Sequence, residues 1–502
     1  MLWRSRRCLT VATIFVTVLA ATSCSTPQAS GPLVHPLQDP IASGVGLTLQ
    51  ELVTIPPSKP NPPPPPGDSL DRWARINYLG EVPDGSGRLF VPDLNGKIYL
   101  IKDGKPQTYL DVGVEFAPNF LNTKSLSSGL VFVAFAPEFK KNGLFYTAHT
   151  EAGAALNPKV PQTKVPDLPY PPNAATQGVV TEWKATDPSA SIFSGTRREV
   201  LRLGFADTIH GIQQIGFNLT ARPGDQDYGL LYIADGDGGV VGEESPGMVT
   251  TVPQDLRVPQ GKILRIDPRG TNGANGNYGI PANNPFVGKP GNALREIYAS
   301  GLRDPVRFSW DPSDGHRMFL ANIGEQQIES IYEVRPGNNF GWSQREGPFM
   351  FKAGDPSCGV FPLPADDSKY GYTYPVVAFA HNPPPGWPPC QTSGHAVVGG
   401  FVYRGSSLPE LRGKYLFADF VPGRFFYADT REMHTGGKLA TVYELTLFTD
   451  KGQPVTMRQL AGNSRVDVRF GTDSHGELYV LSKANGKIWK IIGTRRSSAP
   501  PR

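Results

Sequence analysis

Residues 207–239 read DTIHGIQQIGFNLTARPGDQDYGLLYIADGDGG and contain the pattern that decides the fold. The alternation after His210 predicts one strand, Arg222–Asp227 a charged turn, and Leu230–Ala234 a second strand that ends in an Asp–Gly turn. This order predicts an antiparallel hairpin. Because His210 stands at the start of the first strand, we expect it at the rim of a sheet, where catalytic groups often lie. The alternative is a structural histidine that hydrogen-bonds a neighbouring loop.

A related phrase recurs along the chain: a small turn residue, three or four β-forming residues and often an aspartate. Six copies begin at Gly87, Asn142, Gly229, His316, Gly413 and Gly476. No stretch keeps the apolar spacing and capping residues of a long helix, and the 56 Gly and 50 Pro favour turns. The pattern predicts an all-β fold, a six-bladed β-propeller of four-stranded antiparallel blades, rather than a sandwich.

Three long insertions interrupt the repeats, at residues 155–177, 267–293 and 352–393. They are rich in Pro, Asn and Gly, and loops of this length in a compact domain are usually functional or disordered. We expect these loops on the top face of the propeller, at the mouth of its central channel.

The first 24 residues have the features of an export signal. They begin with a basic segment that contains Arg4, Arg6 and Arg7. The apolar run Leu9–Ala21 is too short for a membrane span. The sequence ATSC that follows resembles a bacterial lipobox and predicts lipidation of Cys24, with simple secretory cleavage near Ala21 as the alternative. We expect an exported protein, either a cell-envelope lipoprotein or a periplasmic or extracellular one, that meets the membrane only through a lipid anchor.

Domain boundaries follow from composition. Residues 25–69 lack a periodic pattern and end in PPSKPNPPPPPG, which favours extended polyproline conformation. We therefore predict a disordered linker over 25–69, a propeller over 70–494 and a disordered tail over 495–502. The formal net charge is +4, and subtracting the three arginines of the signal leaves +1. A nearly neutral body gives no electrostatic case for nucleic-acid binding.

Cysteine usage agrees with export. Two of the four cysteines lie in the signal region, and the mature body keeps Cys358 and Cys390. In an oxidising compartment we expect these two to form a disulfide, and two buried free thiols are the alternative. The chain has no phosphate-binding loop and no H-E-x-x-H motif, and Asp235 and Asp237 lack the spacing of an EF-hand.

A second informative stretch covers residues 296–347. Arg303 stands in a Leu-Arg-Asp-Pro turn after a predicted strand, and an Asn-Phe-Gly-Trp turn at 339–342 adds a rigid aromatic residue. A surface Arg–Asp pair is the alternative interpretation of Arg303 and Asp304.

Several phrases occur in the order found in one family, from about residue 70 to 492. They are GLVFVAFAPEFKKNGLFY, IHGIQQIGF, GKILRIDPRG, EIYASGLRDPVRF, IYEVRPGNNFGW and GHAVVGGFVYRG. In these phrases the chain resembles the soluble glucose/sorbosone dehydrogenases that depend on pyrroloquinoline quinone (PQQ), also called aldose sugar dehydrogenases. The resemblance implies an exported six-bladed propeller that binds PQQ and calcium on its top face.

The resemblance also implies roles for individual residues. His210 matches the general base that takes the proton of the sugar's anomeric hydroxyl, and Arg303 matches the arginine at the quinone oxygens. Arg404 and Arg424 lie where the family places basic groups near the PQQ carboxylates. The turn after the next strand matches the calcium ligands, with Gly324 and Glu325 contributing backbone carbonyls and Glu329 belonging to the acidic cluster that follows.

Four positions depart from the family pattern: Ser127, Ile209, Gln214 and Asp304. Asp304 stands where the family has an asparagine beside the cofactor. A carboxylate there is electrostatically costly next to a tricarboxylate cofactor unless calcium or Arg303 offsets it.

The sequence therefore predicts a sugar or alcohol oxidoreductase that passes hydride to PQQ, with His210 as base and with Arg303 and calcium stabilising charge on the quinone oxygen. The substrate is a small sugar or related alcohol, and the electron acceptor is unknown. The alternative is a non-catalytic propeller that binds carbohydrate or another ligand and has lost PQQ.

Overall fold

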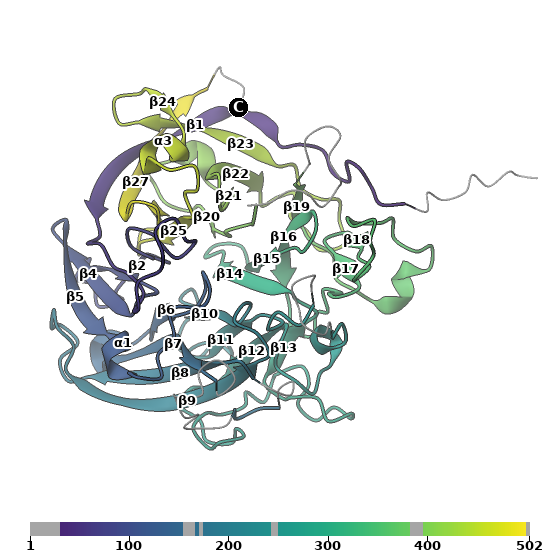
Figure 1. The fold of residues 1–502 in the computed structure, drawn as a ribbon, viewed down its shortest axis with the longest axis horizontal. Helices are drawn as coiled ribbons and strands as arrows, with labels where there is room; N and C mark the ends of the chain where they lie inside the picture. The colour runs from purple at the N-terminus through teal and green to yellow at the C-terminus, as the bar shows by residue number, and fades with distance from the viewer. Residues whose placement is uncertain (1–30, 154–165, 170–173, 242–248, 382–394, 498–502) are drawn as a thin grey trace, which may run out of the picture.

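The computed structural model describes residues 31–153, 166–169, 174–241, 249–381 and 395–497. Within these ranges the regular secondary structure is almost entirely β-strand, and the sheets are arranged around a common centre (Figure 1). The α-helices there are short: α1 (Val112–Glu115), α2 (Phe139–Asn142) and α3 (Met457–Ala461). The described part of the chain contains no helix that is long and apolar enough to cross a membrane.

Four separate antiparallel sheets of four strands follow one another along the chain. The first contains β2 (Gly80–Glu81), β3 (Leu89–Pro92), β4 (Lys97–Lys102) and β5 (Lys105–Asp111). The second contains β6 (Leu130–Phe135), β7 (Leu144–Ala152), β8 (Thr176–Ala185) and β9 (Gly195–Phe205). The third contains β10 (Ile212–Phe217), β11 (Leu231–Asp235), β12 (Lys262–Ile266) and β13 (Ile297–Ser300). The fourth contains β14 (Asp304–Trp310), β15 (Met318–Ile323), β16 (Ile328–Val334) and β19 (Val377–Ala380), and a small hairpin pairs β17 (Arg345–Glu346) with β18 (Phe349–Met350).

The remaining strands form one nine-stranded sheet, in the order β20–β21–β22–β23–β1–β27–β26–β25 with β24 attached to β23. Its strands are β20 (Phe401–Val402), β21 (Lys414–Asp419), β22 (Arg424–Asp429), β23 (Tyr443–Thr449), β24 (Pro454–Val455), β25 (Val468–Thr472), β26 (Leu478–Ser482), β27 (Lys487–Arg496) and β1 (Ile41–Thr54). Strand β1 pairs in parallel with β23 and in antiparallel with β27. This double pairing joins two four-stranded runs into one sheet.

The six-blade prediction is therefore confirmed only in its coarse form, an all-β, propeller-like arrangement. Four separate four-stranded sheets are present among the described residues, and six are not. The six sequence repeats nevertheless form structurally equivalent strands. Each repeat is the second strand of its run of four, namely β3, β7, β11, β15, β21 and β26.

The sheets bury both of their faces because each lies between two neighbours. In β11, Ile233 belongs to the apolar cluster shared with the sheet before it, whereas Tyr232 and Ala234 belong to the cluster shared with the sheet after it. Since successive side chains in a strand point to opposite faces, a short apolar run supplies two cores at once.

The predicted hairpin at residues 207–239 is confirmed. Strands β10 and β11 pair in antiparallel, with Ile212 opposite Asp235. We call the end of the sheets at which His210 and Asp235 lie the upper end. The insertion at 267–293 follows Ile266, the far end of β12, because Lys262 pairs with Asp235 at the upper end. The expectation that this loop lies on the same face as His210 is therefore wrong.

The predicted linker over residues 25–69 is wrong in its middle part, because residues 41–54 form β1. Leu47, Leu49 and Val53 are buried, and the strand is hydrogen-bonded on both edges. The proline-rich composition of the neighbouring residues hid this strand. At the other terminus, β27 includes Arg495 and Arg496 of the predicted tail. The signal segment 1–24, with Cys24, lies outside the described residues.

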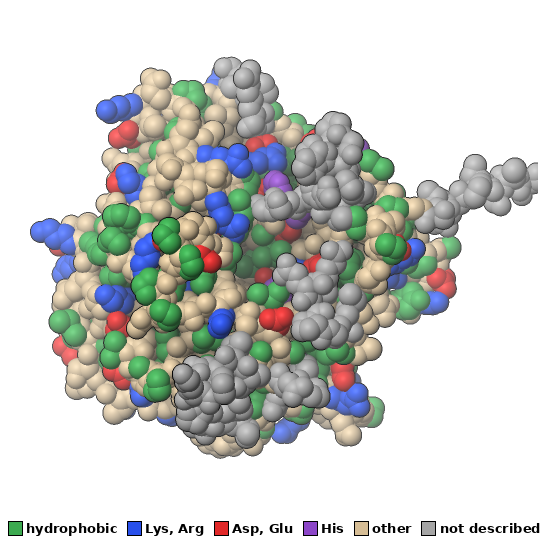
Figure 2. Space-filling view, viewed as in Figure 1, with side chains coloured by type: hydrophobic (Ala, Val, Ile, Leu, Met, Phe, Trp, Pro, Cys, Tyr) green, Lys and Arg blue, Asp and Glu red, His purple; other side chains and the backbone are tan. Residues whose placement is uncertain are grey.

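Figure 2 shows one broad face of the molecule, in the same view as Figure 1. Acidic, basic and histidine side chains lie around its hollowed centre together with apolar ones, and charged side chains also occur at the periphery. The innermost strands thus bring charged groups together at the axis.

Candidate functional site

His210 lies in the turn that leads into β10, and it is 9% exposed. Its backbone adopts the left-handed region, with φ of 52°. The backbone carbonyl of His210 accepts a hydrogen bond of 3.0 Å from the Gly238 N–H. A Cβ at Gly236 would lie 2.4 Å from the same carbonyl, so only glycine fits there. Close backbone packing of the Asp–Gly turn therefore fixes the position of His210.

Asp237 is the partner of the imidazole. Nδ1 of His210 lies 2.8 Å from Oδ1 of Asp237, whose side chain is fully buried. The Gly239 N–H also donates to Oδ1, at 3.0 Å, and Nε1 of Trp342 donates to Oδ2, at 2.9 Å. Since a carboxylate only accepts hydrogen bonds, this network assigns the imidazole proton to Nδ1 and leaves Nε2 as a proton acceptor.

Arg303 contacts the backbone of Asp237 from the start of the neighbouring sheet. Its backbone carbonyl accepts a 2.7 Å hydrogen bond from the Asp237 N–H, and its guanidinium lies 5.9 Å from the centre of the Trp342 ring. The guanidinium forms an ion pair with Glu325, and its Nε has no hydrogen-bond partner among the described residues. Burial opposes the charge, but the carboxylates of Glu325 and Asp237 outweigh it and raise the pKa of Arg303.

The structure therefore brings together His210 and Arg303, which are far apart in the sequence, through Asp237 and Trp342. Sequence reasoning missed both of these connecting residues. Asp237 was considered only as a calcium ligand, and Trp342 only as a rigid aromatic. The predicted hairpin could have identified Asp237. Its antiparallel pairing places the Asp–Gly turn, at the end of the second strand, next to His210 at the start of the first. His210 lies at the rim of its sheet, as predicted, and the Asp–Gly turn leaves it only 9% exposed.

Asp304 stands at the upper end of β14 and is 7% exposed. Its Oδ1 has no hydrogen-bond partner among the described residues. Burial raises the pKa of Asp304, whereas the nearby charges of His210 and Arg303 lower it. The raised pKa favours the neutral carboxyl, which reduces the electrostatic cost of this departure from the family pattern.

The predicted calcium turn wraps around a buried carboxylate. Glu346 accepts backbone N–H bonds from Gln326 at 3.0 Å, Gln327 at 2.7 Å and Ile328 at 2.8 Å. In a trans peptide the carbonyl points opposite to the N–H that follows it, so the Glu325 carbonyl faces away from Glu346. It is thus available to a ligand outside the turn.

Glu329 does not join this turn. Its Oε1 lies 3.0 Å from Nε2 of His381, and its Oε2 accepts a 2.8 Å hydrogen bond from the Val397 N–H. Its carboxylate thus joins two neighbouring sheets, and its assignment to the calcium cluster stays a prediction. Among the described residues no group of three or more His, Cys, Asp or Glu side chains is arranged to hold a metal ion.

The two further arginines assigned to the cofactor lie elsewhere. Arg404 forms a two-point ion pair with Asp311, just beyond the lower end of β14, and seven strand residues place that end about 20 Å from Asp304. Arg424 lies on β22, the third strand of its run from the axis, and forms a two-point ion pair with Glu444 on β23. Each guanidinium thus has one carboxylate partner, Arg404 lies at the opposite end of the sheets from His210, and the role of Arg424 at the cofactor stays a prediction.

Other cations occupy the axis instead. Around the ring of Phe420, Arg469 lies 4.1 Å, Arg465 5.7 Å and Lys483 5.8 Å from the ring centre. Lys483 is 1% exposed, and burial lowers its pKa well below the ordinary value. Sequence reasoning missed these residues, although the alternation in RVDVR at 465–469 places three charged side chains on one face of a strand.

The structure also describes Gln214 and Ser127, two other departures from the family pattern, and one of the two cysteines, Cys358. Oε1 of Gln214 accepts a 2.9 Å hydrogen bond from the Phe308 N–H, and Nε2 of Gln214 donates a 3.0 Å hydrogen bond to the Phe308 carbonyl. Gln214 therefore joins two sheets. Ser127 lines a small hollow together with His149. Cys358 is buried, but Cys390 lies outside the described residues, so their disulfide stays a prediction.

The sequence profile of the glucose/sorbosone dehydrogenase family matches residues 78–490, which include all of the site described above. The chain belongs to this family. The fold agrees with solved members. It superposes on the apo-form of the soluble aldose sugar dehydrogenase of Escherichia coli with a TM-score of 0.58 and 20% identity, covering 90% of this chain and 100% of that one. The PQQ-bound aldose sugar dehydrogenase of Streptomyces coelicolor gives 0.52 and 16%, covering 91% and 100%.

This member of the glucose/sorbosone dehydrogenase family is also similar to curated proteins whose names do not describe a dehydrogenase. The HIPL2 protein of Arabidopsis thaliana is 27% identical over 472 residues, covering 86% of this chain and 64% of that protein. The human Hedgehog-interacting protein is 24% identical over 439 residues, covering 83% of this chain and 51% of that protein. The chain thus spans between half and two thirds of the length of these curated relatives.

Proposed function

We propose that this protein is an exported oxidoreductase that oxidises a sugar or related alcohol with PQQ and calcium. The observation that carries the proposal is the buried Asp237 carboxylate, which holds His210 in the tautomer of a general base next to Arg303. Six repeats, each the second strand of its run, support a six-module ring in which β1 joins the last two modules.

The polar groups around His210 suit an added cofactor. Nε of Arg303 and Oδ1 of Asp304 are buried without a hydrogen-bond partner among the described residues, and unsatisfied groups of this kind are what a polar ligand would satisfy. Arg303 would hold the quinone oxygens. The Glu325 carbonyl would be a calcium ligand. When bound, PQQ would supply a two-electron acceptor for the sugar.

The chain's own residues would handle the proton. Nε2 of His210 would accept the proton of the sugar hydroxyl, and the resulting imidazolium would be stabilised by its 2.8 Å contact with Asp237. Trp342 would keep the carboxylate in position by its hydrogen bond to Oδ2. Because Asp237 and His210 are buried, their interaction acts in a region of low dielectric, where it is stronger than in water.

A second candidate is a non-catalytic propeller that binds another ligand. It is supported by the curated relatives, which include proteins named for an interaction with Hedgehog, and by the carboxylates that already pair with Arg303, Arg404 and Arg424. Titration of the purified apo-protein with PQQ and calcium separates the two candidates. Saturable binding followed by sugar-dependent reduction of an artificial electron acceptor supports the oxidoreductase. Absence of both leaves the binding propeller.

We also propose that the mature protein is anchored by a lipid on Cys24. Mass spectrometry of the mature N-terminus tests this. A diacylglyceryl-modified Cys24 supports the anchor, and an unmodified N-terminus beyond Cys24 contradicts it.

A further inference from the structure

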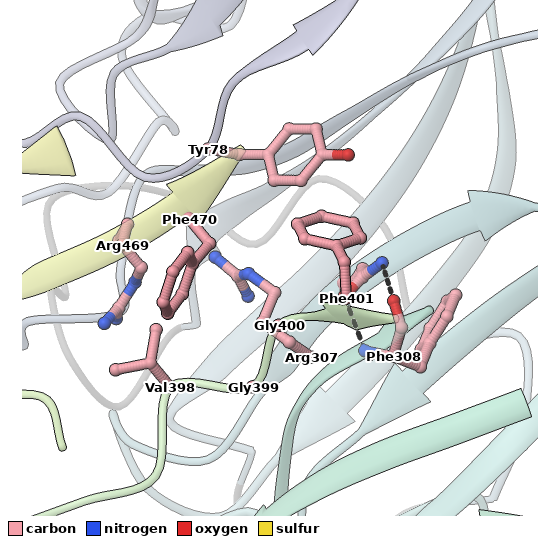
Figure 3. A pocket seen from close by; sticks show the side chains of 10 residues that line it. Tyr78, Arg307, Phe308, Val398, Gly399, Gly400, Phe401, Arg469 and Phe470 are labelled. Atoms are coloured by element: carbon pink, nitrogen blue, oxygen red, sulfur yellow. Dashed lines mark hydrogen bonds between the residues drawn. The ribbon is translucent and has the colours of Figure 1, made fainter. Parts of the chain in front are cut away.

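A small hollow on the axis of the ring lies among the innermost strands (Figure 3). Two arginines line it, Arg307 from β14 and Arg469 from β25. Aromatic side chains and glycines complete the wall: Tyr78, Phe401, Phe470, Gly399 and Gly400. The hollow leaves room for about one water-sized group.

The two guanidiniums have only neutral partners among the described residues. Arg307 donates to the backbone carbonyls of Gln213 at 2.8 Å, Val306 at 2.6 Å and Asn77 at 3.1 Å. Arg469 donates to Oδ1 of the same Asn77 at 3.2 Å and to the Val468 carbonyl at 3.1 Å. Asn77 thus accepts hydrogen bonds from both cations, through its backbone carbonyl and its side-chain oxygen, which are both neutral.

Neither arginine forms an ion pair with a described carboxylate, in contrast to Arg404 and Arg424. Arg307 is 7% exposed, and Arg469 is partly exposed toward the hollow. Burial and the neighbouring charge of Arg469 lower the pKa of Arg307 to about 9. Burial likewise lowers the pKa of Arg469 to about 10. Two cations held close together in a buried place are costly unless a negative charge compensates them.

The aromatic contacts of these cations do not supply that charge. Arg469 lies over Phe420 at 4.1 Å, and Arg307 lies over Phe132 at 5.1 Å. A ring quadrupole attracts a cation but leaves its net charge unchanged. Lys483, which repels both arginines, adds to the positive potential, and the nearest carboxylates, Asp304 and Asp467, contact neither guanidinium.

We propose that this hollow binds a small inorganic anion of the size of chloride, held between Arg307 and Arg469. The size of the hollow excludes a larger ligand, and its two guanidiniums disfavour a cation. The site lies deeper along the axis than His210, because Gln214 and Arg307, both on its wall, stand two or more residues below the upper ends of their strands. It is independent of the proposed oxidoreductase function and would be filled in the apo-protein.

Thermal unfolding of the full-length mature apo-protein tests the site. Chloride is raised from about 1 to about 300 mM while gluconate keeps the ionic strength constant, so that general screening does not change. We expect a saturable rise in Tm of roughly 1–4 °C with chloride. Arg469→Gln should abolish the rise, whereas the matched variant Arg404→Gln should keep it from its own baseline. An equal response in Arg469→Gln, or no response in the parent, contradicts the proposal.

A second measurement needs no variant, in case Arg469→Gln does not fold. Crystals of the parent grown in bromide give an anomalous signal at bound halide. A peak between the two guanidiniums supports the proposal. Peaks only on the protein surface would show adventitious binding and would overturn it.

Discussion

The imidazole of His210 and the carboxylate of Asp237 lie 2.8 Å apart, and the indole N–H of Trp342 holds the other carboxylate oxygen at 2.9 Å. This arrangement connects two sheets, because Trp342 and Arg303 reach Asp237 from beyond β13. The first two predictions concern this contact.

Replacing His210 tests its role as a base. His210→Asn is the better variant because asparagine tolerates the left-handed backbone at this position, where φ is 52°. We expect nearly parental Tm and retained PQQ binding, with sugar oxidation reduced by about 10²–10⁴-fold. Reconstituted enzyme and an artificial electron acceptor provide the assay. Parental turnover in a folded variant would falsify the catalytic assignment, and unfolding would favour a structural histidine.

Trp342→Phe should destabilise the protein without removing the aromatic ring. The change leaves Oδ2 of the fully buried Asp237 without its indole donor, which should cost about 1–3 kcal/mol in the free energy of unfolding. Trp310→Phe is the matched control, because Trp310 makes ring contacts but no hydrogen bond within the described residues. Urea unfolding of both variants measures the difference. Equal losses would show that the indole N–H contributes little.

Asp235 should make stability fall as the pH rises. Both of its carboxylate oxygens lack partners among the described residues, and burial raises its pKa well above 3.8. Between the unfolded and the folded pKa the native state binds more protons than the unfolded state, so stability declines upward from about pH 4. The advantage of Asp235→Asn over the parent should therefore grow with pH, by at most about 1.4 kcal/mol per pH unit. Asp103→Asn, at an exposed turn, is the control and should show no such trend.

Two truncations test the role of β1. Deleting residues 1–38 keeps β1 and should leave a folded, monomeric protein. Deleting residues 1–69 removes it and leaves the edges of β23 and β27 unpaired, which should lower Tm strongly and cause aggregation. Size-exclusion chromatography and thermal unfolding compare the two. Similar behaviour of both would mean that β1 does not contribute to the ring.

The state of Cys358 is a separate question. A disulfide with Cys390 would close a loop and stabilise the fold by roughly 3–4 kcal/mol in the chain-entropy model. Alkylation of the native, unreduced protein followed by mass spectrometry decides this. We expect no alkylated thiol, and two alkylated cysteines would contradict the bridge.

The sequence was sufficient for the fold class, because repeats such as those at Gly87 and Gly229 are strands with turn residues between them. It also pointed to His210 and Arg303, which stand in specific motifs and which the structure brings to the same residue, Asp237. It could not identify β1, whose alternation is interrupted at residues 41–46 and lies next to a proline-rich stretch. It could not show that Arg404 and Arg424 pair with carboxylates, because a motif gives a position along a strand but not which carboxylate is close in space.

The pairing of strand β1 determines when the ring can close during synthesis of the chain. Its two partners, β23 and β27, lie near the other end of the chain. While the chain emerges, β1 therefore has neither of its partners, and the early sheets must form before the ring can close. The ring closes only when the last strands pair with both edges of the first, so closure depends on synthesis of nearly the whole domain.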